Sequence, residues 1–381
     1  MKMKSAAALC LAATIGMATT ARADDLSAKA AAAFQPIVKQ YDIPGLVIGV
    51  TRNGEHAFYA TGLASRADKR PATPDTLFEL GSVSKIFNVT LAALAEQRGA
   101  LRLEHTVAQH VCDTPCTIAG GLTLMDLATH HTGGMPLQVP DDIKDTTDLV
   151  GWLKAWKPQQ PGSRSYSNIS IGLLGHITGQ AMGMSYRKAF ATVLRPAIGL
   201  ENTWIDVPKT AMADYAYGYH RTTNKPIRVG TGVLDAEAYG VKSSARDMLK
   251  LLDLELGVGA APEDLRKAIA RTQEGQLRTA NFVQDMIWEQ YPWPVPLQEM
   301  LAGNSADFIL KPQPATPIVP ALPQQKDVIL SKTGSTNGFG AYVAILPGEK
   351  LGVVVLANRN YPNEERIKAT HALIREVLGS Q

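Results

Sequence analysis

The chain has 381 residues, of which 45% are hydrophobic and 19% are charged. This is an ordinary globular composition with ample material for a large core. Of its 38 Lys and Arg residues, Lys2, Lys4 and Arg22 precede Asp24, so a chain cleaved there keeps 35 basic and 35 acidic residues. A net charge of zero argues against nucleic acid or an anionic membrane surface as the partner.

The N-terminal residues have the features of a secretory signal peptide. Lys2 and Lys4 form a basic start, the run from Ser5 to Thr20 carries no charge, and Ala21-Arg22-Ala23 is an A-x-A cleavage site. The apolar run is short for a membrane anchor, and no later segment has about 20 uninterrupted apolar residues. The sequence therefore predicts a signal peptide at residues 1–23 and export to the periplasm, with no membrane association after cleavage.

Cysteine and histidine spacing gives no recognisable metal site. Cys112 and Cys116 form a C-x3-C pair, which in an exported protein can close a small disulfide loop or remain reduced. His105 and His110 lie nearby, but their spacing fits no zinc pattern, and the chain lacks an H-x-H or H-E-x-x-H pair. We therefore expect no metal and no cofactor.

The first third of the chain predicts a helix, a hairpin and a second helix. Residues 26–42 are alanine-rich with apolar residues on one side, which favours a helix. Residues 45–62 form two β-rich runs around Asn53-Gly54, the strongest short signal for a hairpin. Residues 79–99 predict a helix that Gly99 ends.

The remainder predicts a helical middle followed by a second hairpin and a final helix. Residues 101–208 consist mostly of helical fragments and loops, whereas 340–360 predict a hairpin that turns at Pro347-Gly348. Residues 363–379 have the apolar periodicity of an amphipathic helix. The proline-rich stretch from Lys311 to Gln325 predicts a surface loop.

Three separated motifs carry the candidate chemistry. Ser82 and Lys85 form an S-x-x-K pair at the front of a predicted helix, but Ser185 and Lys188 form a second copy, so this spacing alone is a weak signal. Tyr166-Ser167-Asn168 follows downstream. Lys332-Thr333-Gly334 comes last, and we expect it to open a late strand. The three motifs in this order are a far stronger signal than any one of them.

Together these motifs resemble those of the class C serine β-lactamases, the cephalosporinases. Serine β-lactamases and penicillin-binding proteins carry S-x-x-K, S-D-N and K-T-G, and here Y-S-N stands in place of S-D-N. The resemblance covers essentially all of the chain after residue 23. It extends to four further stretches: Gly133–Asp142, Asp235–Ser244, Ala302–Leu310 and Leu356–Ala369.

The resemblance implies an α/β fold of the β-lactamase and penicillin-binding-protein type. Its antiparallel sheet would be flanked by the N- and C-terminal helices and joined to a mostly helical subdomain. We expect a single domain over residues 24–381. The α/β part would comprise about 24–100 and 230–381, and the helical part about 101–229.

The physical chemistry of these residues agrees with an acyl-transfer site. Ser82 near a helix N-terminus would sit in a favourable electrostatic field as its oxygen gains negative charge. Lys85 lies one turn further along the same face, and a crowded cationic pocket would lower its pKa. Lys85 and Lys332 would also press Tyr166 toward phenolate. Whether Lys85 or Tyr166 takes the serine proton stays open.

The resemblance also implies roles for individual residues. The catalytic set is Ser82, Lys85 and Tyr166. The backbone N–H groups of Ser82 and Ser335 would form the oxyanion hole. Lys332 and Thr333 would face the substrate carboxylate, with Asn363 and Arg366 on its far side. Gln138 and Asn168 would bind the acylamino side chain, whose pocket Tyr239 would line. The implied substrate-binding set is Gln138, Asn168, Tyr239, Lys332, Thr333, Gly334, Ser335, Asn363 and Arg366.

Several of these residues also have plain structural explanations. Asn363 suits the N-cap of the last helix, and Arg366 could be a surface charge. Tyr239 could simply pack, and Gln138 could support its own loop. The chain also departs from the family's usual sequence at His130, His131 and Thr132, and at Ile169, where a proline is common. These departures leave the substrate spectrum open.

The sequence thus predicts a monomeric periplasmic serine β-lactamase that hydrolyses cephalosporins and penicillins, small-molecule substrates, and so confers β-lactam resistance. The first alternative is a penicillin-binding D,D-peptidase or an esterase of the same fold. The intact Lys332-Thr333-Gly334 motif and the Gln138 loop favour the lactamase. The second alternative is a non-catalytic β-lactam sensor or scaffold, which would not need to keep Lys85 and Tyr166.

Overall fold

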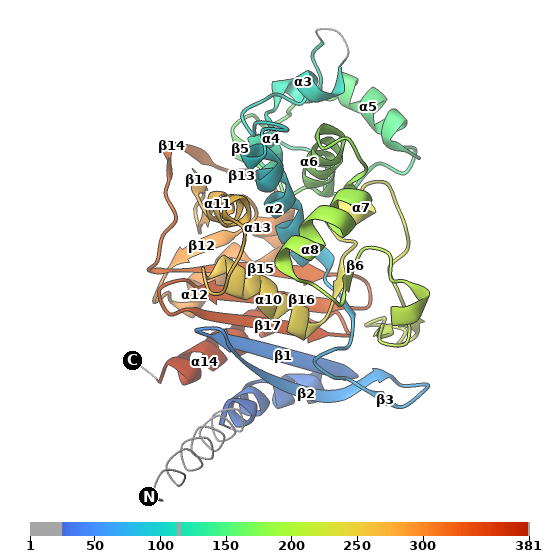
Figure 1. The fold of residues 1–381 in the computed structure, drawn as a ribbon, viewed down its shortest axis with the longest axis vertical. Helices are drawn as coiled ribbons and strands as arrows, with labels where there is room; N and C mark the ends of the chain where they lie inside the picture. The colour runs from blue at the N-terminus through green and yellow to red at the C-terminus, as the bar shows by residue number, and fades with distance from the viewer. Residues whose placement is uncertain (1–24, 113–115, 380–381) are drawn as a thin grey trace, which may run out of the picture.

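A large antiparallel sheet organises the molecule (Figure 1). The computed structural model describes residues 25–112 and 116–379; the predicted signal peptide lies outside them. The sheet has ten strands in the order β14-β10-β11-β12-β15-β16-β17-β1-β2-β3. Their bounds are β1 Gly45–Arg52, β2 Glu55–Ser65, β3 Arg70–Pro71, β10 Gly275–Arg278, β11 Val283–Gln284, β12 Glu289–Pro292, β14 Thr316–Leu322, β15 Val328–Ser335, β16 Gly340–Leu346 and β17 Leu351–Ala357.

Helices cover both faces of this sheet, and its central strands are therefore buried on both sides. Successive side chains of a strand point to opposite faces. Leu46 thus belongs to one apolar cluster and its neighbour Val47 to the other. The first cluster includes the helix at residues 25–40 and α14 (Asn363–Leu378), and the second includes α2 (Ser84–Gln97), α10 (Ala245–Glu255) and α11 (Glu263–Thr272).

The helical region lies beside the sheet, at the top of Figure 1. Its helices are α3 Ala108–Val111, α4 Leu124–Ala128, α5 Thr146–Ala155, α6 Asn168–Ala181, α7 Tyr186–Ala189 and α8 Arg195–Ile198. Three short helices lie elsewhere: α9 Asp235–Ala238, α12 Leu297–Gly303 and α13 Ala306–Leu310. Small sheets pair β4 (Phe78–Glu79), β9 (Lys242–Ser243) and β6 (Thr203–Trp204); β5 (Ser163–Arg164) with β13 (Gln313–Pro314); and β7 (Gly218–Tyr219) with β8 (Pro226–Ile227).

Both predicted hairpins are confirmed. Asn53 and Gly54 join β1 to β2 with φ values of 54° and 81°, the left-handed conformation that a two-residue turn of type I′ requires. Residues 347–350 join β16 to β17. The predicted helices at the two ends of the chain are also present, at residues 25–40 and in α14.

The proline-rich stretch is not the predicted surface loop. Residues 313–314 form β13, and residues 316–322 form β14, the edge strand of the large sheet. Proline lacks the N–H that a ladder needs, but an edge strand has one side without a partner and tolerates it. The local proline signal was therefore misleading because it carries no information on where a strand lies in a sheet.

The predicted helix over residues 79–99 begins later than expected. Glu79 belongs to β4, Gly81–Val83 form a 3₁₀ turn, and α2 starts only at Ser84. The buried Glu79 carboxylate accepts hydrogen bonds from Tyr215 Oη at 2.6 Å and from Thr336 Oγ1 at 2.6 Å. These tertiary contacts hold Glu79 in an extended segment that joins the turn to the rest of the fold.

Strand β15 packs directly against this 3₁₀ turn. A Cβ atom at Gly334 would lie 2.1 Å from the carbonyl oxygen of Leu80, and one at Gly81 would lie 2.5 Å from the amide nitrogen of Ser335. Only glycine permits this approach at both positions. Strand β15 begins at Val328 and ends at Ser335, so Lys332-Thr333-Gly334 lies at the end of the strand and not at its start, which corrects the sequence prediction.

Among residues 25–112 and 116–379, no helix combines the length and apolar character needed to cross a membrane.

We expect Gly334→Ala to lower the free energy of unfolding by about 1–3 kcal/mol, because the new methyl group must displace backbone atoms of the 3₁₀ turn. Denaturant unfolding measures this change. Gly151→Ala in α5 is the matched control, since its Cβ would meet nothing within 4 Å and should stabilise the helix by about 0.5–1 kcal/mol. Equal effects of the two substitutions would contradict the close packing of β15.

Candidate active site

A buried lysine holds the candidate nucleophile. Lys85 lies in the first turn of α2, has no exposed surface, and donates from Nζ to Ser82 Oγ at 2.9 Å. Its ammonium group also donates to Asn168 Oδ1 and to the carbonyl oxygen of Ala238, each at 2.8 Å. Three acceptors match the three hydrogens of an ammonium group. Ser82 itself is partly exposed in the 3₁₀ turn, so its oxygen is accessible from outside.

Tyr166 lies between two lysines. Its ring centre is 5.2 Å from Lys85 Nζ and 5.2 Å from Lys332 Nζ. Burial raises the pKa of the Tyr166 hydroxyl, but the positive charges of Lys332 and Lys85, with contacts to Ser82 and Lys85, lower it to about 8. For Lys85, burial has the opposite effect and lowers the pKa to about 8. The Tyr166 phenolate opposes this shift, and the positive charge of Lys332 adds to it. The two groups therefore titrate in one pH range and can exchange a proton.

Two further charged residues lie beside Lys332 and Tyr166, and no motif indicated them. Glu289 of β12 lies 3.5 Å from Lys332 Nζ through Oε1, and both side chains are 3% exposed. Arg164 of β5 lies with its guanidinium carbon 5.7 Å from the Tyr166 ring centre and donates to Gln284 Oε1 at 2.6 Å. Neither residue belongs to a recognised motif: Arg164 stands two residues before Tyr166 in the chain, whereas Glu289 reaches the site only through the pairing of β12 with β15.

A pocket collects most of the predicted set. Its walls come from the 3₁₀ turn, the end of β15 and the start of α14, with Ile309 of α13 at one side. The lining residues are Ser82, Tyr166, Glu289, Ile309, Lys332, Thr333, Gly334, Ser335 and Asn363.

The remaining predicted residues lie around this pocket rather than in its walls. Gln138 is exposed and accepts from Asn168 Nδ2 at 3.1 Å, so a hydrogen-bonded chain runs from Gln138 through Asn168 to Lys85. Tyr239 is half-buried and directly follows Ala238, whose carbonyl oxygen accepts from Lys85.

Arg366 is buried behind β15 and is not a surface charge. Its Nη1 donates to the carbonyl oxygen of Gly334 at 2.8 Å and to Ser335 Oγ at 3.0 Å. It also donates to Asn363 Oδ1 at 2.9 Å and to Asn360 Oδ1 at 2.7 Å. Burial lowers the pKa of Arg366 to about 10, against the effect of Tyr361. The side chain thus braces β15 from behind.

Asn363 is the first residue of α14 and not its N-cap, because Pro362 holds the cap position and no side chain caps the helix. Its Oδ1 instead accepts from Arg366, while the residue lines the pocket. The N-cap explanation of Asn363 is therefore wrong.

The backbone of Ser335 faces away from the sheet ladder. The N–H of Thr336 donates to the carbonyl oxygen of Phe339. Hydrogen-bonded and non-hydrogen-bonded pairs alternate along antiparallel strands. The next pair, Ser335 opposite Gly340, is therefore non-hydrogen-bonded, and the N–H of Ser335 points away from β16. On the other edge of β15, the ladder with β12 ends at Ser331. The N–H of Ser335 thus lies on an open edge beside the turn that carries Ser82.

The sequence departures lie behind the pocket. His130 and Thr132 are buried, and Ile169 is fully buried in the first turn of α6, where its N–H donates to Ser167 Oγ at 3.1 Å. The second S-x-x-K copy has a structural role, since Ser185 caps α7 by accepting from the N–H of Lys188 at 3.3 Å.

No group of three or more His, Cys, Asp or Glu side chains within the described ranges is arranged to hold a metal ion. Cys112 and Cys116 form a disulfide, the first of the two alternatives left by the sequence.

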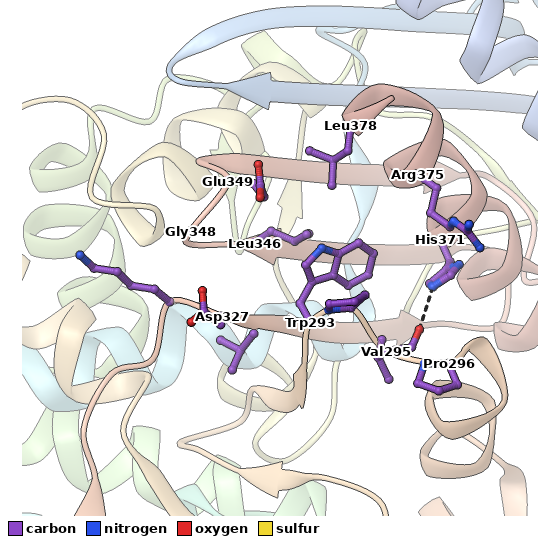
Figure 2. Close-up of a pocket in the computed structure, with 13 residues that line it drawn as sticks. Trp293, Val295, Pro296, Asp327, Leu346, Gly348, Glu349, His371, Arg375 and Leu378 are labelled. Carbon is purple, nitrogen blue, oxygen red and sulfur yellow. Dashed lines mark hydrogen bonds between the residues drawn. The ribbon is translucent and has the colours of Figure 1, made fainter. Parts of the chain in front are cut away.

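A larger pocket lies away from these residues. Figure 2 shows it between α14 and the strands β15 and β16, with Trp293, His371 and Arg375 among its lining and a hydrogen bond from His371 Nε2 to the carbonyl oxygen of Val295 at 3.2 Å. It contains none of the predicted catalytic residues. Its size alone therefore does not make it the active site.

The smaller pocket has the parts that acyl transfer requires. A serine hydroxyl accepts a hydrogen bond from a lysine whose pKa is lowered, and a phenol of lowered pKa lies beside both. Lys332 supplies positive charge at the same wall for an anionic ligand group.

We expect ultraviolet difference titration of the protein against Tyr166→Phe to report one tyrosine that ionises near pH 8. Lys332→Met should move this midpoint to higher pH, because Lys332 lowers the pKa values of both Tyr166 and Lys85. Lys267→Met, at an exposed pair with Glu263 on α11, is the control and should leave the midpoint unchanged. An unshifted midpoint in Lys332→Met would refute this electrostatic coupling.

Comparison with known proteins identifies the family. Residues 30–377 match the beta-lactamase family model. A class C β-lactamase from Rhodobacter sphaeroides is 62% identical, with a TM-score of 0.90 over 92% of this chain and 99% of that chain. A β-lactamase from Sulfitobacter sp. EE-36 is 59% identical, with a TM-score of 0.92 over 94% and 99%. A β-lactamase/D-alanine carboxypeptidase from Pseudomonas syringae is 41% identical, with a TM-score of 0.89 over 92% and 98%. The chain therefore belongs to the β-lactamase family and is a serine β-lactamase of class C.

Proposed function

We propose that this protein is a periplasmic enzyme that hydrolyses cephalosporins and penicillins through an acyl-enzyme on Ser82 and so confers β-lactam resistance. The observation that carries the proposal is the 2.9 Å hydrogen bond from Lys85 Nζ to Ser82 Oγ, beside a tyrosine whose pKa is about 8. An unassisted serine is far too weak an acid to attack an amide, and this contact supplies its activation.

Acylation begins with loss of the Ser82 proton to the pair formed by Lys85 and Tyr166. Ser82 Oγ attacks the β-lactam carbonyl carbon, and the negative charge on the carbonyl oxygen is stabilised by the N–H groups of Ser82 and Ser335. The C–N bond then breaks, and the ring nitrogen takes the proton held by the pair. The product is an ester on Ser82 with the lactam ring open.

Deacylation uses the same groups in the reverse sense. The pair takes a proton from water, the hydroxide equivalent attacks the ester carbonyl, and Ser82 Oγ leaves with the returned proton. The pKa values of about 8 for Lys85 and Tyr166 support this shuttling, because each group can hold or release a proton near neutral pH. The reaction consumes one water molecule and needs no oxidant or cofactor.

Substrate contacts follow from the walls of the pocket. The Lys332 ammonium and Thr333 hydroxyl suit the carboxylate of the β-lactam, with Asn363 beside them. Gln138 and Asn168, joined by a 3.1 Å hydrogen bond, suit the acylamino side chain. Tyr239 follows the Ala238 carbonyl that anchors Lys85, next to this side-chain position. We assign Arg366 a supporting role, since its donors are occupied by β15 and by the start of α14.

We expect Ser82→Ala to lower the kcat for a chromogenic cephalosporin by about 10⁴-fold or more, because the nucleophile is lost. Intact mass of the same mixture should show no covalent adduct, while the fold persists. The measurement uses residues 24–381. Ser185→Ala removes the serine of the second S-x-x-K copy and should keep full activity, with only the stability cost of a lost helix cap, about 0.5–2 kcal/mol. Retained activity in Ser82→Ala would place the nucleophile elsewhere.

The second candidate is a D,D-carboxypeptidase, favoured by the named activity of the Pseudomonas syringae relative. The lifetime of the acyl-enzyme separates the two functions. We expect penicillin turnover with at most a transient adduct on the protein. A stable penicillin adduct, together with release of D-alanine from an acyl-D-Ala-D-Ala peptide, would assign the carboxypeptidase instead.

A further inference from the structure

His130 contacts the Tyr166 segment at three points. Its ring centre lies 4.5 Å from that of Tyr166. The N–H of Ser165, the residue before Tyr166, donates to the carbonyl oxygen of His130 at 2.7 Å. The N–H of Ser167, the residue after Tyr166, donates to His130 Nδ1 at 3.3 Å. One fully buried residue thus accepts hydrogen bonds from the N–H groups of both chain neighbours of Tyr166, Ser165 and Ser167, and packs against the ring between them.

These contacts determine the protonation of the imidazole. A backbone N–H can only donate, so Nδ1 accepts from Ser167, and Nδ1 also lies 2.8 Å from Ser170 Oγ, a hydroxyl that can donate to the same nitrogen. The His130 pKa also lies well below its usual value, because the ring is buried and because Arg164 on β5, Lys85 on α2 and Lys332 on β15 direct positive charge at it. His130 is therefore a neutral imidazole that adds no charge to the cationic surroundings of Tyr166.

The backbone conformation of His130 also favours a polar residue. Its φ is 59°, in the left-handed region that histidine, asparagine and aspartate adopt more readily than other non-glycine residues. The His130 carbonyl accepts a second hydrogen bond, from the N–H of Thr132 at 2.8 Å. The turn at His130 is thereby built so that its carbonyl and its side chain reach the same segment.

We propose that His130 is a positioning residue that orients Tyr166 for proton transfer by accepting hydrogen bonds from the backbone N–H groups of its two chain neighbours, Ser165 and Ser167. The inference rests on the proposed role of Tyr166 in the hydrolysis of β-lactams. His130 does not line the pocket and acts only through Tyr166. A displacement of about 1 Å at a reacting group can cost about 100-fold in rate, so this bracing is enough to affect catalysis.

Two substitutions distinguish the contribution of the hydrogen-bond acceptor at Nδ1 from that of the ring packing against Tyr166. His130→Asn can place Oδ1 where Nδ1 lies and tolerates a positive φ, but it removes the ring packing. His130→Phe keeps a ring against Tyr166 but leaves the N–H of Ser167 without its acceptor. The neighbouring His131→Asn is the matched control, because the His131 imidazole contacts Asp126 at 3.1 Å.

We expect His130→Phe to lower the kcat for a chromogenic cephalosporin by about 10- to 100-fold, with KM changed by less than about threefold. His130→Asn should keep at least about a third of the wild-type kcat, and His131→Asn should match the wild type. Because His130 is neutral, the acid limb of the kcat/KM profile should stay at the same pH in His130→Asn. Thermal unfolding of all three variants establishes that each is folded at the assay temperature.

A wild-type kcat in His130→Phe would overturn the proposal, and so would equal losses in His130→Phe and His130→Asn, which would indicate a general packing defect. Failure of the proposed function is distinguishable from either result. It would appear as absence of turnover by the wild-type protein or as retained activity in Ser82→Ala, whatever the His130 variants do.

Discussion

The buried ammonium group of Lys85 is the constraint on which the site depends. An ammonium group removed from water costs several kcal/mol unless acceptors replace its hydration. Its three acceptors are Ser82 Oγ, Asn168 Oδ1 and the carbonyl oxygen of Ala238. They come from three separate segments: the 3₁₀ turn, the first residue of α6 and the last residue of α9. Loss of any of them would leave a donor unpaired, so the lysine joins the helical region to the part of the chain that packs on the sheet.

The same burial explains the electrostatics of the site. Removing Lys85 from water lowers its pKa, and the charge of Lys332 lowers it further, while both lysines draw Tyr166 down from its usual value. The pKa values of both groups are therefore lowered to about 8, by burial for Lys85 and by the neighbouring positive charges for Tyr166. The Glu289 carboxylate lies 3.5 Å from Lys332 Nζ and so is directed at Lys332. Positive charge remains around the phenol and favours its phenolate form, the form that would receive a proton in the proposed mechanism.

Sequence patterns predicted those parts of the structure that local signals determine. The Asn53-Gly54 hairpin, the second hairpin and the final helix follow from turn residues and apolar periodicity, and the three motifs indicated most of the pocket lining. The predictions failed where tertiary contacts decide. The prolines of β14 are tolerated because that strand lies at the sheet edge, and the surface-charge alternative for Arg366 stayed open because nothing local shows that β15 covers this residue. Glu289 belongs to the site through the pairing of β12 with β15, which no spacing along the chain reveals, whereas Arg164 stands two residues before Tyr166 but in no motif that indicated it.

The position of Lys332-Thr333-Gly334 at the end of β15 follows from what the strand must do there. Up to Ser331, β15 is paired on both edges; beyond it, only β16 remains and the other edge is free. The Gly334–Ser335 peptide group then presents its N–H to that free edge, while Arg366 holds its carbonyl oxygen from behind at 2.8 Å. A carbonyl that accepts from a guanidinium is fixed in direction, and the N–H of the same rigid peptide plane is fixed with it. In the proposed role of oxyanion donor, an N–H held in this way would cost no reorganisation when charge develops on the substrate, which is the condition for electrostatic catalysis. This N–H is available because Ser335 lies beyond the end of the ladder with β12. At a position paired on both edges, it would donate to the neighbouring strand instead.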